Sequence, residues 1–167
     1  GILEAVALLT KKFPDTTLII AGDGPEEGNL KRRAQELGIA NSVKFLGRVS
    51  RAETWHLRKT SEVYVLNSTY EGLPHTVLTS FAARIPVVAT DIPGTNEAVY
   101  HEKTGLLVPP HNPQALCNAI TRLFNDAALC GQLVDGGVTI LEEKFSWRAH
   151  LQTLLELLES VRAHPRN

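Results

Sequence analysis

Short apolar runs rich in β-branched residues alternate with segments of helical periodicity along most of this chain, and this alternation restricts its fold more than any other feature. The apolar runs have the length of β-strands and cover residues 17–21, 43–46, 63–66, 87–89 and 106–108. Strands that alternate with helices form parallel sheets with right-handed crossovers. The sequence therefore predicts a doubly wound α/β fold, with helices on both faces of one parallel sheet.

The two ends of the chain depart from this alternation. Three helical stretches without an intervening strand follow the last apolar run, at residues 113–124, 127–145 and 147–162, and we expect them to cap or flank the sheet. Residues 2–13 have the apolar spacing of a helix interior but no capping residue before them. We therefore expect residues 1–167 to form one domain and a further part of the protein to precede it.

Composition excludes several classes of function. The 17 basic and 18 acidic side chains give a net charge of -1, without the basic excess typical of nucleic-acid-binding proteins. Cys117 and Cys130 lack the CxxC spacing or histidine partners of a metal or redox site. No apolar run reaches the ~18 residues of a transmembrane helix, and residues 1–9 do not resemble a signal peptide. We expect a cytoplasmic location.

Ligands of open parallel sheets bind beyond the carboxyl ends of the strands, so the strand-to-helix loops are the candidate sites. The first such loop contains Gly22 and Gly24, but Glu27 stands where the third glycine of a dinucleotide fingerprint would be. The next strand ends at Arg48 instead of a ribose-binding acid. The pattern disfavours an NAD site and predicts a tight turn with Pro25 as the first residue of a helix.

The third such loop, residues 68–76, carries a single carboxylate, Glu71, and runs directly into a helix. The amides of His75, Thr76 and Val77 at the helix start suit an anion such as a diphosphate, and Glu71 can accept hydrogen bonds from sugar hydroxyls. A solvated Glu71 and a helix start capped by water agree with the local sequence equally well. No Ser-His-Asp, Cys-His or metal-ligand constellation has a recognisable spacing.

Five motifs carry a family resemblance when they are taken together. They are LIIAGDGP at residues 18–25, VKFLG at 43–47, STYEGLP at 68–74, PVVAT at 86–90 and TGLLVPP at 104–110. In this order and spacing, nearly the whole chain resembles the carboxyl-terminal, Rossmann-like domain of retaining GT-B glycosyltransferases of family 4.

The resemblance implies a donor site for a nucleoside diphosphate sugar, usually UDP- or GDP-linked, without an obligatory metal or other cofactor. The base would lie near Arg48 and Val49, the diphosphate over the amides from Leu73 to Thr76, and Glu71 beside the donor sugar as the catalytic carboxylate. The donor-binding residues that it implies are Gly22, Gly24, Arg48, Val49, Glu71, Gly72, Leu73, Pro74, His75, Thr76 and Thr79.

The chain also departs from the family pattern. Thr79 stands where the family usually has a second glutamate, which binds the ribose, and Arg84 stands where glycine is common. Glu97 matches another common family position, although a structural role at a helix start is an equal alternative. The upstream strand and loop with Arg and Lys for the diphosphate are absent, as is the amino-terminal domain that holds the acceptor.

The activity implied for the parent protein is transfer of a sugar from a nucleotide sugar to an acceptor hydroxyl with retention at the anomeric carbon. Its expected partners are the donor and the missing acceptor-binding domain, and any contact with the inner face of the membrane would be made by that missing half. We expect the isolated chain to be inactive alone. The alternative is a non-catalytic or degenerate module that binds a nucleotide, a nucleotide sugar or a partner protein.

Overall fold

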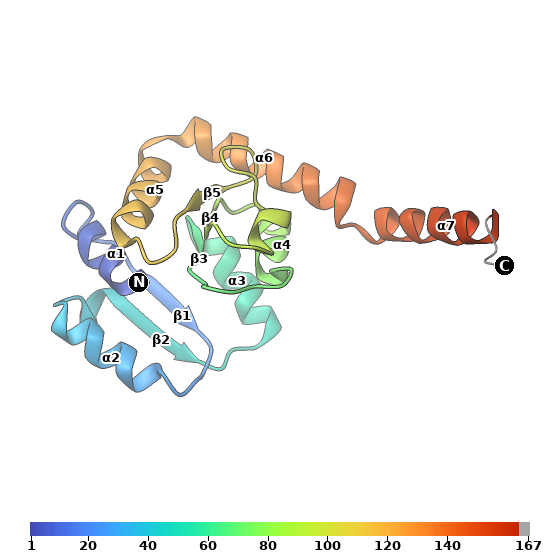
Figure 1. Ribbon diagram of the computed structural model, residues 1–167. Helices are drawn as coiled ribbons and strands as arrows, with labels where there is room; N and C mark the ends of the chain where they lie inside the picture. The colour runs from blue at the N-terminus through green and yellow to red at the C-terminus, as the bar shows by residue number, and fades with distance from the viewer. Residues whose placement is uncertain (164–167) are drawn as a thin grey trace.

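The computed structural model describes residues 1–163 and has the predicted α/β architecture of parallel strands and helices (Figure 1). Its strands are β1 (Leu18–Ala21), β2 (Val43–Gly47), β3 (Tyr64–Leu66), β4 (Val87–Thr90) and β5 (Leu106–Val108). Strand β1 pairs in parallel with β2, while β3, β4 and β5 form a second parallel sheet in that order. The prediction of one continuous sheet is therefore wrong, because β1 and β3 do not pair within residues 1–163.

The helices lie in the segments between and after the apolar runs, where helical spacing predicts them. They are α1 (Ile2–Leu9), α2 (Glu27–Glu36), α3 (Arg51–Thr60), α4 (His75–Ala82), α5 (Pro113–Asn125), α6 (Ala127–Lys144) and α7 (Trp147–Ala163). A capping box starts α3, in which Glu53 N donates to Ser50 Oγ and Ser50 N donates to Glu53 Oε2. The side chains of Asn112 and Asp126 accept from the first turns of α5 and α6.

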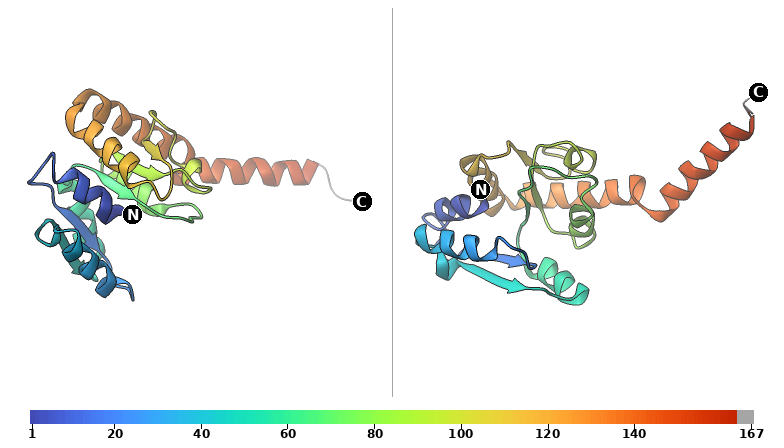
Figure 2. Two further views of the ribbon diagram at one scale, coloured as in Figure 1. Left: turned by 60° about the vertical axis from the view of Figure 1, so that its left-hand side comes forward. Right: turned by 60° about the horizontal axis from the view of Figure 1, so that its bottom comes forward.

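Helix α1 packs against both sheets. Ala5 and Leu9 belong to the core cluster around Val88 of β4, whereas Leu3 and Val6 belong to a second cluster that includes Val43 of β2. Figures 1 and 2 show α1 between the two sheets, with α5 beside it. The apolar spacing of α1 thus supplies two buried faces, one for each sheet.

Helix α2 begins later than the sequence predicts. Pro25 is not its first residue, because Glu27 N donates to Gly24 O and closes a turn that contains Pro25 and Glu26. The helix then begins at Glu27 and ends before Gly38, whose φ of +70° is a left-handed conformation that glycine adopts without strain. The tight turn after β1 is present, but the helix start is displaced.

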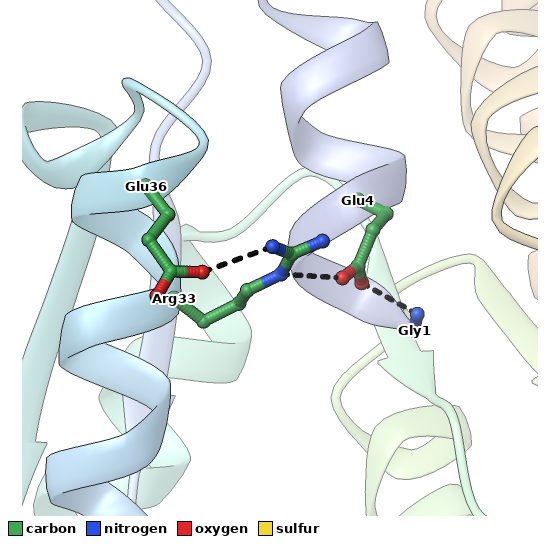
Figure 3. A network of polar contacts seen from close by, with 4 residues as sticks. All are labelled: Gly1, Glu4, Arg33 and Glu36. Atoms are coloured by element: carbon green, nitrogen blue, oxygen red, sulfur yellow. Dashed lines mark hydrogen bonds and ion pairs between the residues drawn. The ribbon is translucent and has the colours of Figure 1, made fainter.

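A polar network joins α1 to α2 at the surface (Figure 3). Arg33 Nε donates to Glu4 Oε1 at 2.9 Å, and Arg33 Nη1 donates to Glu36 Oε2 at 3.0 Å. The terminal ammonium of Gly1 donates to Glu4 Oε2 at 2.5 Å. Mainly this bond, together with that from Arg33, lowers the pKa of Glu4 to about 2.

The last three helices do not all flank the sheet. Helices α5 and α6 cover the sheet of β3, β4 and β5, as predicted, but α7 projects away from the body of the molecule (Figures 1 and 2). Its apolar side chains stay exposed, for example Trp147 and Leu155. For α7 the prediction is therefore wrong, because helical spacing identifies an apolar face without indicating what covers it.

Candidate functional site

Glu71 is held at the carboxyl end of β3 by a chain of hydrogen bonds. The buried hydroxyl of Thr90, at the end of β4, donates to Ser68 O at 2.6 Å. Ser68 Oγ then donates to Glu71 Oε1 at 2.7 Å, and the Glu71 side chain is half-buried. One carboxylate oxygen is thereby fixed by the scaffold, and the carboxylate keeps further lone pairs for a ligand.

The loop after β4 fixes the backbone of the same segment. Gly94 lies against the peptide of Glu71 and Gly72, so a Cβ atom at Gly94 would lie 2.4 Å from Glu71 O and 1.9 Å from Gly72 O. Its φ of +85° is also in the left-handed region. Only glycine combines a left-handed φ with room for this close approach, and the two loops therefore pack against each other beyond β3 and β4.

Helix α4 presents free amides beside this carboxylate. No side chain caps the helix, and Val77 N turns back to Pro74 O at 2.9 Å. Within residues 1–163, neither His75 N nor Thr76 N donates a hydrogen bond, although Pro74 itself is buried. These N–H groups lie at the positive end of the helix dipole and can bind an anion.

The glycine loops after β1 and β2 form a second pair. Gly22 N donates to Gly47 O at 2.8 Å, and Arg48 Nη2 lies 3.4 Å from Asp23 Oδ2. Both charged side chains are exposed, and so is Gly24. Within residues 1–163, no hydrogen bond or ion pair connects the loops after β1 and β2 to the loops after β3 and β4. The structure therefore brings Gly22 and Arg48 together, and separately Glu71 and the α4 amides.

The remaining predicted residues lie on the surface around these two groups. Gly72, Leu73, His75 and Thr76 are exposed, and Val49 is half-buried. Thr79 is exposed on α4, but its hydroxyl lies 3.0 Å from both His75 O and Thr76 O, to which it donates. Its proton is therefore used within its own helix, so Thr79 offers a ligand only its acceptor lone pairs.

Two concavities lie elsewhere on the molecule. One of about 600 Å³ lies beyond β4 and is lined by Asp91, Asn96, Tyr100 and His101 among others. The other, of about 510 Å³, is lined by Glu62 and Arg84 among others. Glu71 lines neither of these two, and it lies on an open edge instead.

Three residues that support the site escape the sequence reasoning. Ser68, Thr90 and Gly94 set the position of Glu71. Ser68 acts within the same loop, three residues before Glu71, whereas Thr90 and Gly94 act across contacts between segments that are distant in sequence. Two features of the sequence mark these positions. Thr90 is a polar residue at the end of an apolar strand, and Gly94 is a glycine in a strand-to-helix loop. Neither signal specifies its partner without the fold.

The described residues, 1–163, form neither a metal-ligand cluster nor a membrane-spanning helix. Among these residues, no three or more His, Cys, Asp or Glu side chains gather as metal ligands would. In the same part of the chain, no helix combines the length and apolar character needed to cross a bilayer.

The architecture and sequence are similar to those of glycosyltransferases. A protein of Haemophilus influenzae described as an uncharacterized glycosyltransferase is 35% identical over 135 residues, which are 80% of this chain and 38% of that protein. The chain spans less than half the length of this and other relatives.

Solved structures show the same likeness. Anabaena Alr3699/HepE in complex with UDP superposes with a TM-score of 0.85 at 27% identity, over 95% of this chain and 44% of that one. The same protein in complex with UDP-glucose gives a TM-score of 0.84 at 26% identity, with the same coverage. The family described as Glycosyl transferases group 1 matches residues 1–137. This chain therefore belongs to the group 1 glycosyl transferases.

Proposed function

We propose that this chain binds a nucleoside diphosphate sugar at the edge formed by residues 68–76, and that it is the donor-binding half of a retaining GT-B glycosyltransferase of family 4. The observation that carries the proposal is a fixed carboxylate, Glu71, on a loop that leads into the free amides of His75 and Thr76. A carboxylate accepts from sugar hydroxyls, and helix-start amides donate to a diphosphate. A nucleotide sugar needs both groups.

The similar structures favour a uridine nucleotide. The Anabaena protein carries UDP in one structure and UDP-glucose in another, and it shares 27% and 26% identity with this chain in the two comparisons. We therefore propose a UDP-linked donor in preference to a GDP-linked donor. The base would lie near Arg48 and Val49, beside the turn of Gly22 and Gly24, and the diphosphate over Leu73 to Thr76.

The transfer step follows from these positions. When the glycosidic bond to the diphosphate breaks, negative charge develops on the leaving phosphate oxygens, and the α4 amides stabilise that charge without reorganising. Glu71 orients the sugar so that the acceptor oxygen bonds to the anomeric carbon on the face from which the diphosphate leaves, and the proton of the acceptor hydroxyl passes to the departing phosphate oxygen. We propose that no metal is obligatory, because the amides would take over the neutralisation of the diphosphate.

The acceptor site belongs to the other part of the proposed parent enzyme. The relatives are more than twice as long as this chain, and we propose that an amino-terminal domain supplies the acceptor pocket and any contact with the inner face of the membrane. The isolated chain should then bind donor but transfer no sugar, because nothing positions an acceptor. Robust transfer by residues 1–167 alone would contradict this division of roles.

Thr79 supports a second candidate function, that of a non-catalytic binding module. In the family pattern a glutamate at this position binds the ribose, whereas the Thr79 hydroxyl donates to its own helix. Loss of one charge-assisted hydrogen bond costs about 1.5 to 3 kcal/mol. A non-catalytic module that binds a nucleotide weakly, or only a partner protein, is therefore the second candidate.

Calorimetric titration of the chain with UDP, GDP, ADP and UDP-glucose separates the two candidates. The donor proposal requires Glu71→Ala to weaken UDP-glucose about tenfold or more while UDP changes little, since one charged hydrogen bond is worth about 1.5 to 3 kcal/mol. The matched control is Glu62→Ala, at the amino end of the strand that precedes Glu71, which should alter neither affinity. Absence of binding by every nucleotide at millimolar concentration would favour the non-catalytic module.

A further inference from the structure

Strand β5 is an outer strand of its sheet and has one edge that no other strand covers. Within residues 1–163 it pairs with β4 alone, and on that side Asp91 N donates to Val108 O at 2.8 Å. Successive residues of a strand direct their backbone groups to opposite sides, so Gly105 and Leu107 face outward. Unpaired groups on such an edge readily accept another strand. What covers these two residues therefore decides whether the sheet can be extended.

A turn and an imidazole cover the outer edge of β5. Glu102 N donates to Gly105 O at 2.9 Å, and Leu107 N donates to His101 Nδ1 at 3.0 Å. Pro109, the next residue that faces outward, has no N–H group. Gly105 is therefore held by the backbone of the turn, whereas the Leu107 N–H group is held by a side chain.

The backbone of this turn is fixed independently of the imidazole. Helix α6 packs against it so closely that a Cβ atom at Gly136 would lie 2.0 Å from Lys103 O. The turn also keeps Glu102 in a left-handed conformation, with φ of +59°, which a side chain adopts only where the surroundings impose it. The His101 side chain, by contrast, is exposed. It can therefore leave Leu107 while the turn stays in place.

The hydrogen bond from Leu107 requires a neutral imidazole. Because Nδ1 is the acceptor, the proton of the neutral ring lies on Nε2. A protonated imidazole carries a proton on both nitrogens and accepts at neither. Protonation would place the Nδ1–H group against the N–H group of Leu107, so the ring would have to turn away. The contact is therefore sensitive to pH in the range where histidine changes its charge.

The ring has space to turn into, because His101 and Leu107 both line the hollow of about 600 Å³. The other side chains of this hollow that can titrate are those of Asp91, Tyr100 and Lys103. Carboxylate, phenol and ammonium groups ordinarily keep their charge states between about pH 5 and pH 8. Glu102 follows His101 in the chain, and a hydrogen bond from Arg122 is the main cause that lowers the pKa of this carboxyl. Among these groups, the imidazole is therefore the one whose charge changes in that range.

We propose that His101 is a pH-sensitive lock on the outer edge of β5. The neutral imidazole holds the Leu107 N–H group and closes the edge, and the protonated imidazole turns into the hollow and releases it. An N–H group that is free beside a hollow of this size can bind water or the carbonyl groups of another extended segment. The proposal rests on the edge of β5 and does not depend on the proposed donor.

Amide exchange at Leu107 tests the lock, with protection measured relative to an unstructured amide at about pH 8 and at about pH 5. His101→Asn places a carbonyl oxygen on the same Cγ atom that carries Nδ1, so this variant keeps an acceptor that does not titrate. His101→Ala removes the acceptor. The matched control is His111→Asn, which removes an exposed histidine outside the hollow. The nitrogen shifts of the His101 ring report its tautomer and charge at each pH.

Protection of Leu107 in the native chain should fall about fivefold or more from pH 8 to pH 5, the factor that one typical hydrogen bond contributes. The His101→Asn variant should be protected alike at both pH values, His101→Ala should be poorly protected at both, and His111→Asn should behave like the native chain. The amide of Asp91, on the inner side of β5, should stay protected throughout.

Four results would overturn the lock. They are constant protection of Leu107 in the native chain, an equal fall in His101→Asn, persistent protection in His101→Ala, and a parallel loss of protection at Asp91, which would show that the whole sheet loosens. An imidazole that stays neutral at about pH 5 overturns the proposal as well, because the lock would then never open in the range where histidine titrates.

Discussion

Gly94 and Gly72 approach so closely that a single methyl group on Gly94 would lie 1.9 Å from the carbonyl oxygen of Gly72. Real Cβ atoms do not approach backbone oxygens to this distance, so the contact specifies glycine. It joins the loop after β4 to the loop that carries Glu71. The position of the proposed sugar-binding carboxylate thus depends on a backbone contact between two strand-to-helix loops.

We predict that Gly94→Ala destabilises the chain by about 2 to 4 kcal/mol, because the substitution combines a backbone clash with a positive φ. Urea denaturation measures the loss. Gly28→Ala is the matched control, since no atom lies within 4 Å of its Cβ position in α2, and it should be neutral or stabilising by up to about 1 kcal/mol. Equal effects of the two substitutions would show that the loop contact is not formed.

Ser68→Ala should weaken binding of UDP-glucose about fivefold, less than Glu71→Ala does. The substitution keeps the carboxylate but removes the hydroxyl that holds it, and a typical hydrogen bond contributes about 1 kcal/mol. Ser61→Ala removes a comparable hydroxyl at the end of α3, where it donates to Leu57 O, and should leave the affinity unchanged. If Ser68→Ala has no effect on UDP-glucose, the hydrogen bond does not orient Glu71 for the sugar.

The network of Glu4 predicts a stability difference that depends on pH. The folded pKa of Glu4, about 2, lies below its value in the unfolded chain, so the ionised group stabilises the fold above about pH 4.5. This contribution is lost as the pH falls from there towards 2. Glu4→Gln should lower the free energy of unfolding by at most about 1 kcal/mol at pH 7, with the difference vanishing near pH 2.

Urea denaturation at several pH values checks this difference, with Glu142→Gln on an exposed site of α6 as the control. Acetylation of the Gly1 amino group should raise the pKa of Glu4, because it removes the ammonium that makes the main contribution. If Glu4→Gln changes the free energy of unfolding by the same amount at pH 7 and at pH 2.5, the ionised Glu4 carboxylate does not stabilise the fold as proposed.

Arg84 adopts a left-handed conformation, with φ of +59°, at the position where the family pattern has glycine. Arg84→Gly and Arg84→Ala both remove the ion pair with Asp135, which has an Nη2 to Oδ1 distance of 2.6 Å. They differ in the backbone penalty, so the glycine variant should be more stable than the alanine variant by about 1 kcal/mol. Thermal unfolding compares the two, and a more stable alanine variant would show that the backbone at this position is not strained.

The order of elements could be predicted from the sequence because the signals are local. The apolar run of residues 87–89 and the helical spacing of residues 113–124 each determine their own segment, and the structure agrees at both places. The prediction of a single continuous sheet failed for a non-local reason. Strand alternation does not report whether β1 and β3 are neighbours, since pairing depends on what occupies the space between them.

The candidate site could be predicted only in part. The sequence places Glu71 immediately before the start of a helix, and the structure keeps the two together. It does not indicate that Thr90 supports the loop of Ser68 and Glu71, because the hydrogen bond from Thr90 to Ser68 O connects the ends of different strands. Nor does it indicate that the Thr79 hydroxyl turns back to its own helix, which follows from side-chain rotamer and helix geometry.

The central claim is that the donor binds at the start of α4 with its sugar beside Glu71, and NMR titration of the isotope-labelled chain tests it most directly. UDP should shift the backbone amides of residues 73–76 most strongly, and UDP-glucose should add shifts at Glu71 and Gly72 that UDP alone does not produce. Those added shifts should disappear in Glu71→Ala, while the shifts at His75 and Thr76 remain. If the largest shifts lie instead around Asn96 and Tyr100, or if UDP and UDP-glucose give identical spectra, the account of this site is contradicted.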